Sequence, residues 1–106
     1  MQFRAVMQRG KRVEQPSLIV LWRPWNGPRQ VGFAVSRRVR GAVCRNRARR
    51  RLREAYRVSC QSLPSGVQLV CVAREPAAKD SFHALYREMK EALAVVARQF
   101  RAPAKS

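Results

Sequence analysis

The residues with the clearest chemical capacity are ten arginines that lie within one segment, residues 37–57. The segment reads RRVRGAVCRNRARRRLREAYR and holds a single acidic residue, Glu54. A guanidinium group is always charged, and it can grip a phosphate with two parallel hydrogen bonds or stack on a base. Arginines spaced i,i+3 and i,i+4 on a helix repel each other at roughly 0.2–0.5 kcal/mol per pair. Several such pairs together indicate a polyanionic partner, because an ordinary solvated helix face interleaves both signs.

Groups that could catalyse hydrolysis are few and dispersed. Phosphodiester cleavage by a protein needs clustered carboxylates for two metal ions, or histidines for acid–base catalysis. The chain has six acidic residues and one histidine, His83. Glu75 and Asp80 flank a turn, while Glu88 and Glu91 stand among basic residues and are interpreted as part of a solvated face. We therefore expect this protein to contribute no catalytic and no metal-binding residues.

The whole chain is strongly basic. Its 106 residues include 23 Lys and Arg against six Asp and Glu, for a formal net charge of +17. Such an excess repels itself unless a polyanion neutralises it, and nucleic acid is the commonest polyanion that does so. An anionic membrane surface is the alternative, but the longest apolar run is far below transmembrane length and no charged-then-apolar leader pattern is present. We expect a nucleic-acid-binding protein of the cytoplasm, without a membrane partner.

The length and the cysteines narrow the class further. We expect one nucleic-acid-binding domain over residues 1–101 and a flexible polar tail over residues 102–106. Cys44, Cys60 and Cys71 include no Cys-x-x-Cys pair for zinc, and they are interpreted as small apolar side chains in a reducing compartment. The sequence also lacks a Gly-rich phosphate loop, so no small-molecule substrate is expected.

Hydrophobic periodicity predicts an α+β sandwich with the order helix, two or three strands, helix, strand, helix. Helices are expected over residues 3–9, 43–60 and 82–100, and strands over residues 12–14, 17–22, 31–36 and 67–73. Turn residues between Pro24 and Pro28 predict that strands 17–22 and 31–36 form an antiparallel hairpin. Asp80 or Ser81 is expected to cap the last helix.

The helix over residues 43–60 is predicted to bury one narrow face. At the helical period, a stripe roughly 120° wide holds Cys44, Ala48, Leu52, Ala55, Tyr56 and Ser59. The opposite face holds Asn46, Arg50, Arg53 and Arg57, flanked by Arg47, Arg49 and Glu54. Arg45 falls at the edge of the apolar stripe and can stay solvated only at the start of the helix. Asn46 either bonds a ribose hydroxyl or a base edge, or caps the helix if the helix begins there.

An ordered pattern in the middle of the chain is similar to a known family. It consists of Val31 to Arg38 (VGFAVSRR), Gly41-Ala42-Val43, Arg45-Asn46-Arg47, Arg49-Arg50 and Leu52 to Tyr56 (LREAY). This pattern resembles the signature of the bacterial ribonuclease P protein. The resemblance extends from the opening Phe3 to Gly10 through the strand at 67–73 and the following Arg74-Glu75-Pro76.

The resemblance implies a fold and a function. The fold would be a two-layer sandwich of order α-β-β-β-α-β-α, in which the arginine helix joins two parallel strands by a left-handed crossover, against the general right-handed preference. The function would be that of a protein subunit that binds the catalytic RNA of ribonuclease P and the 5′ leader of precursor tRNA. It would assist endonucleolytic removal of the leader, with catalysis and its magnesium ions carried by the RNA.

The resemblance also assigns residues by position. The RNA subunit would be contacted by Ser36, Arg37, Arg38, Arg45, Asn46, Arg47, Arg49, Arg50, Arg53 and Arg57. The leader would lie in a cleft lined by Phe3, Met7 and Leu21. Met7 and Leu21 stand where the family commonly has aromatic residues, which leaves less stacking surface for bases. The alternative is a structural ribosomal RNA-binding protein, which would share the size and charge but lack a cleft for a mobile single strand.

Overall fold

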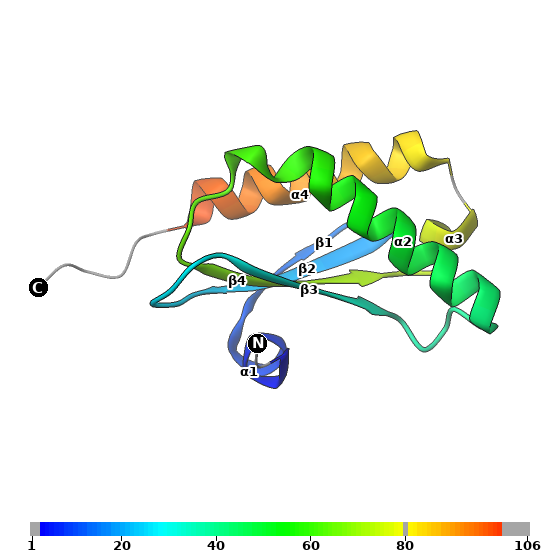
Figure 1. The fold of residues 1–106 in the computed structure, drawn as a ribbon, viewed down its shortest axis with the longest axis horizontal. Coiled ribbons are helices and arrows are strands. Elements are labelled where there is room, and N and C mark those ends of the chain that lie inside the picture. The colour runs from blue at the N-terminus through cyan, green and yellow to red at the C-terminus, as the bar shows by residue number, and fades with distance from the viewer. Residues whose placement is uncertain (1–2, 80, 101–106) are drawn as a thin grey trace, which may run out of the picture.

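A four-stranded mixed sheet carries the helices of this chain (Figure 1). The computed structural model describes residues 3–79 and 81–100. The elements are α1 (Phe3–Arg9), β1 (Lys11–Glu14), β2 (Leu18–Pro24), β3 (Gln30–Val35), α2 (Ala42–Ser59), η1 (Cys60–Ser62), β4 (Val67–Ala73), α3 (Pro76–Lys79) and α4 (Phe82–Gln99). This order confirms the predicted helices and strands. It adds η1 and α3, which are about one turn long and too short to show a helical period in the sequence.

The strand order in the sheet is β1-β2-β4-β3, so β4 lies between β2 and β3. The predicted hairpin of strands 17–22 and 31–36 is therefore wrong. β4 runs antiparallel to β2 and parallel to β3, and all but one of its residues are buried. A strand that is apolar on both faces is stable at the centre of a sheet. The turn residues after β2 indicated a chain reversal, but they could not show that a later strand would occupy the space.

The two faces of the sheet are covered unequally (Figure 1). α2 and α4 lie on one face, over the main core around Trp22 and Leu52. α1 lies on the other face, where Val6 packs against Leu21 and Val70. The molecule is thus a two-layer sandwich, as predicted, with α1 as a partial third layer. The parallel neighbours β3 and β4 are joined through α2, as the resemblance implied.

α1 is held by its docking rather than by its own stability. A seven-residue helix is marginal in water, while full burial of a valine side chain such as Val6 contributes about 1.5–3 kcal/mol. Gly10 ends the helix, as predicted, and its N–H donates to the Val6 carbonyl at 2.8 Å. A Cβ on Gly10 would lie only 2.8 Å from the Trp22 carbonyl oxygen, so glycine allows the chain to turn directly into β1.

α4 begins at one of the two caps predicted for it and packs one face against the main core. The Ser81 hydroxyl accepts a hydrogen bond from the Ala84 N–H at 3.2 Å, which confirms one of the two expected caps. Asp80, the other expected cap, lies outside the described residues, as does the expected tail over residues 102–106. The buried stripe of α4 is Leu85, Met89, Ala92, Leu93 and Val96. No helix in the described part of the chain is long and apolar enough to cross a membrane.

Glu88 is not part of a solvated face, so that prediction is wrong. Its carboxylate accepts from the Ser17 backbone N–H at 2.7 Å and from the Ser17 hydroxyl at 3.0 Å, and Ser17 is fully buried. The pair therefore fastens α4 to the connection between β1 and β2. The charges that surround Glu88 in the sequence gave no indication of a contact 71 residues away.

We expect Glu88→Ala to lower the free energy of unfolding by about 1–3 kcal/mol, because a buried donor is left unsatisfied. Glu91→Ala is the matched control, since Glu91 is exposed on the same helix and the change in helix propensity is the same. Its effect should stay within about 0.5 kcal/mol. Urea denaturation of both variants measures the difference, and equal losses would show that the contact with Ser17 is unimportant.

Candidate nucleic-acid interface

α2 packs an apolar stripe on the sheet, as predicted, and exposes Arg47, Arg50, Arg53 and Arg57 to solvent. The helix begins after Gly41, whose φ of 89° favours glycine, so Asn46 lies inside the helix and the alternative that it caps the helix is wrong. The buried stripe is Ala48, Leu52, Ala55 and Tyr56. Cys44 was placed on this stripe but is exposed, because the first turn of α2 extends past the ends of β3 and β4 (Figure 1). Ser59 is half-buried.

Six arginines of this region have side chains that make no hydrogen bond, ion pair or ring contact with residues 3–79 and 81–100. They are Arg37, Arg38, Arg40, Arg47, Arg49 and Arg50. All are exposed except Arg49, which is half-buried. Asn46 is exposed between them. We call these six arginines of the loop at 36–41 and of α2, together with Asn46, the arginine face.

The other four arginines of α2 have partners inside the protein, and two of them, Arg53 and Arg57, contact other side chains. Arg57 donates from Nε to Glu54 Oε2 at 3.1 Å, and this hydrogen bond lowers the pKa of Glu54 and raises the pKa of Arg57. The Arg53 guanidinium lies 5.8 Å from the centre of the Phe33 ring, a cation–π distance. Phe33 in turn packs edge-on against Tyr56. Arg53 and Arg57 remain predicted RNA contacts, but they are less free than Arg47 and Arg50.

The Arg45 guanidinium donates hydrogen bonds to the backbone of the protein. Its Nη1 donates to the carbonyls of Ser36 at 2.9 Å and Val39 at 3.0 Å, and its Nη2 donates to the Val35 carbonyl at 3.3 Å. It lies half-buried in the first turn of α2. This is the position at which the sequence predicted that Arg45 could stay solvated. The Ser36 hydroxyl accepts from the Arg38 N–H at 3.2 Å. Arg45 and Ser36 therefore fix the loop that presents the other loop arginines.

Replacement of Arg45 by alanine should lower the free energy of unfolding by about 1.5–3 kcal/mol, the usual range for hydrogen bonds that involve a charged group. Arg47→Ala is the control, because Arg47 is exposed on the same helix and donates to no described group. Chemical denaturation compares the two variants. A loss no larger than that of Arg47→Ala would show that the Arg45 hydrogen bonds do not stabilise the loop.

The α1 side of the sheet holds the residues that the resemblance assigned to the leader. Phe3 and Met7 are 45% and 51% exposed, whereas Leu21 is only 8% exposed beneath α1. Leu21 therefore supports α1 and offers almost no surface of its own. A Cβ on Gly32 of β3 would overlap the Phe3 ring, so the ring rests directly on the strand. Gly32 was not predicted as a site residue, although a glycine inside a strand is a signal that could have indicated this close approach.

A hollow of about 660 Å³ lies on the α1 side of the sheet and extends to Arg38 of the arginine face. Its floor includes Ile19 and Val72, which pack against the cluster beneath α1. Its other lining residues include Ser36, the two arginines Arg38 and Arg74, and one carboxylate, Glu75. An exposed aromatic ring, an apolar floor and nearby arginines are components with which proteins hold single-stranded nucleic acid.

The described residues show no group of three or more His, Cys, Asp or Glu side chains that could hold a metal ion. His83 is exposed in the first turn of α4, where the sequence placed it. All three cysteines are free, and burial raises the pKa of the Cys71 thiol to about 12. What this surface can do chemically is bind a polyanion with guanidinium groups and an unpaired base with an aromatic ring.

Sequence comparison places the chain among known proteins. The family model described as Ribonuclease P matches residues 1–97. The ribonuclease P protein component of Gluconacetobacter diazotrophicus is 40% identical over 95 residues, which cover 87% of this chain and 82% of that relative. The component from Chloroflexus aurantiacus is 46% identical over 81 residues, covering 76% of this chain and 60% of the relative.

Solved structures agree in fold. The ribonuclease P protein of Thermotoga maritima has a TM-score of 0.75 at 23% identity, covering 87% of this chain and 88% of that one. The Staphylococcus aureus protein has a TM-score of 0.73 at 22% identity, covering 89% and 87%. At this identity the structures support the architecture, and the sequence matches carry the assignment. The chain belongs to the ribonuclease P protein family.

Proposed function

We propose that this protein binds the catalytic RNA of ribonuclease P through its arginine face and holds the 5′ leader of precursor tRNA on the α1 side of the sheet. The observation that carries the proposal is the separation of two different surfaces. Unneutralised arginines lie on α2 and the 36–41 loop, while the exposed ring of Phe3 and the 660 Å³ hollow lie on the other side. Ser36 and Arg38 stand where the two surfaces meet.

The arginine face fits a folded RNA. Arg47 and Arg50 are one helical turn apart and exposed, so they can follow successive phosphates, and exposed Asn46 can reach a ribose 2′-hydroxyl. Arg45 contributes by holding the loop in place. Phosphate contacts of this kind provide affinity and orientation rather than sequence recognition.

The α1 side fits a single strand. A duplex keeps its base faces stacked inside, whereas a leader exposes them to a ring such as Phe3. This favours the leader over a structural role in the ribosome, the alternative considered from the sequence. The family match and the named relatives are likewise ribonuclease P proteins.

We assign the chemical step and its magnesium ions to the RNA. The support is the chemistry of the side chains. The described carboxylates form no cluster that would hold a metal ion, and the Glu88 carboxylate accepts hydrogen bonds from Ser17. A body with a formal charge of +17 would screen phosphate repulsion that divalent ions must otherwise relieve. We place the protein in the cytoplasm, in keeping with its three free cysteines.

Cleavage of a precursor tRNA by a bacterial ribonuclease P RNA, measured across magnesium concentrations with and without the protein, tests the proposal. We expect the protein to shift cleavage to lower magnesium and to cleave nothing by itself. Cleavage by the purified protein alone, or an unchanged magnesium requirement in its presence, would contradict the proposal.

A further inference from the structure

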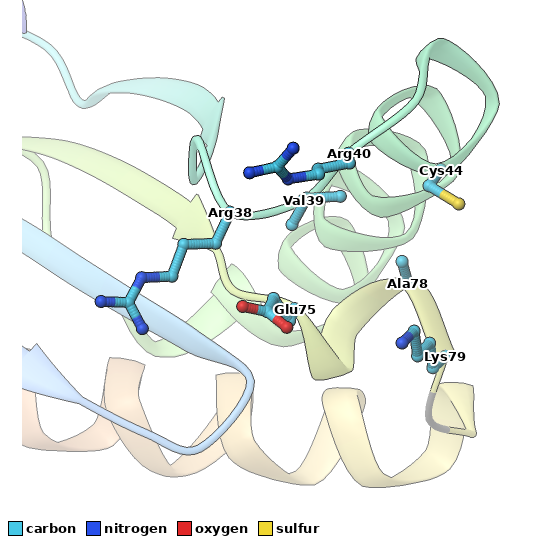
Figure 2. A pocket seen from close by; sticks show the side chains of 7 residues that line it. All are labelled: Arg38, Val39, Arg40, Cys44, Glu75, Ala78 and Lys79. Atoms are coloured by element: carbon cyan, nitrogen blue, oxygen red, sulfur yellow. The ribbon is translucent and has the colours of Figure 1, made fainter.

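A second hollow, of about 540 Å³, lies beside the start of α2 (Figure 2). The loop residues Val39 and Arg40 and the first-turn residue Cys44 form one side of it. Ala78 and Lys79 of α3 form the other side. The resemblance assigned one lining residue, Arg38, to the RNA subunit, but neither it nor the sequence pattern assigned a ligand to the hollow itself. α3 packs against α2, and residues of both helices line the hollow.

The lining combines three kinds of chemistry. The buried side chains of Val39 and Ala78, 4% and 5% exposed, provide apolar surface. Three exposed cations also line it: Arg38, Arg40 and Lys79. One carboxylate, Glu75, lies among these cations in Figure 2 and forms no ion pair with any described residue.

We propose that this hollow receives one unpaired nucleotide of an RNA strand, with the base inside and its flanking phosphates on the cations. A volume of about 540 Å³ lies within the range of small-ligand pockets and is ample for one base. Apolar surface accommodates the face of a base, and guanidinium and ammonium groups bind phosphate. A free mononucleotide offers the same base and phosphate groups, so an experiment must distinguish it from an RNA strand.

Glu75 indicates which edge of the base is bound. A carboxylate repels phosphate, so its place in a phosphate-binding surface calls for a donor on the ligand. The exocyclic amino group of cytosine is such a donor, and carboxylates accept from it in base recognition. Uracil presents a carbonyl oxygen at the same position and would be repelled. The hollow should therefore prefer cytosine to uracil.

The position of the hollow favours an RNA strand over a free nucleotide. Arg38 and Glu75 line both this hollow and the 660 Å³ hollow of the α1 side. The two cavities therefore meet at shared walls near the ends of β3 and β4, and one strand can pass from the α1 side to the arginine face. This inference rests on the proposed function in one respect, that the partner of the protein is an RNA.

The first experiment compares binding of the single-stranded octamers C₈ and U₈, which differ in the amino group and the carbonyl oxygen at issue. We expect the protein to bind C₈ roughly fivefold or more tightly than U₈, the lower end of the range for one base contact. Glu75→Gln should abolish this preference, because a glutamine amide can serve either base. Glu91→Gln, which removes the same charge from an exposed site on α4, should retain the preference. Equal binding of both octamers by the unaltered protein would overturn the proposal.

The second experiment uses Cys44 as a reporter. Cys44 is exposed in the lining, Cys71 is buried, and a Cys60→Ser background removes the half-buried third thiol. We expect C₈ to slow alkylation of Cys44 by N-ethylmaleimide at least fivefold, and CMP at the same nucleotide concentration to leave the rate unchanged. Equal protection by CMP would assign the hollow to a free nucleotide, and no protection at saturating C₈ would leave it empty. Either result overturns the proposal. The proposed function fails separately, if the protein does not lower the magnesium requirement of the RNA.

Discussion

Replacement of Arg47 and Arg50 by alanine is expected to weaken binding to the ribonuclease P RNA by roughly 20-fold near ~0.15 M salt. Each phosphate contact contributes about 0.7–0.9 to the slope of log affinity against log salt, so the slope should fall by about 1.4–1.8. The fold should survive, since both side chains are exposed and lie off the buried stripe of α2. Titrations at several salt concentrations measure the affinity and the slope together.

The matched control replaces Arg87 and Lys90, which are exposed on α4. It removes the same two charges from a helix outside both hollows and the arginine face. Its slope should stay near that of the unaltered protein, because long-range attraction is screened over about 10 Å at ~0.1 M salt. If both double variants lost affinity equally, net charge rather than the arginine face would explain binding.

Phe3→Ala should lower the affinity of the assembled ribonucleoprotein for precursor tRNA by about 5–150-fold, the range that corresponds to stacking of one base on an aromatic ring. Binding of mature tRNA, which has no leader, should hardly change. Gly32→Ala should act in the same direction, because the added methyl group would displace the Phe3 ring from its place on β3. Equilibrium binding of the two tRNAs measures the discrimination directly.

Phe3→Leu is the control for a purely structural role of this side chain. Leucine keeps apolar contact with the strand but has no ring on which a base can stack. We expect its melting temperature to stay near that of the unaltered protein while discrimination between the two tRNAs falls. Equal losses for precursor and mature tRNA, together with a lower melting temperature, would show that Phe3 only fastens α1 to the sheet.

The sequence predicted the elements and the buried face of α2 because both depend on local periodicity. Ala48 and Leu52 recur at the spacing that a helix on a sheet requires, and they are buried. The hairpin was mispredicted because strand neighbours are decided by the whole sheet. Nothing local to β2 or β3 could show that β4, the most apolar strand, would take the position between them.

The functional side chains divide in the same way, into those that local sequence predicts and those that depend on tertiary contacts. The arginine face was visible in the sequence, since unbalanced charge at helical spacing needs no tertiary information. The contacts of Arg45, Glu88 and Gly32 join segments that are distant in the sequence or that meet only after docking. The 540 Å³ hollow depends on α3, which was too short to predict. The resemblance assigned Leu21 by its place in the sequence, and this could not show that Leu21 lies under α1.

Site-specific crosslinking tests the central claim, that two sides of the sheet hold two different RNAs. In a background of Cys44→Ser and Cys60→Ser, a photoreactive group is attached at Arg50→Cys or at Met7→Cys, and the protein is assembled with the RNA subunit and precursor tRNA. We predict that Arg50→Cys crosslinks to the RNA subunit and Met7→Cys to the leader. Crosslinks from both positions to the same RNA, or the reverse pairing, would contradict this assignment.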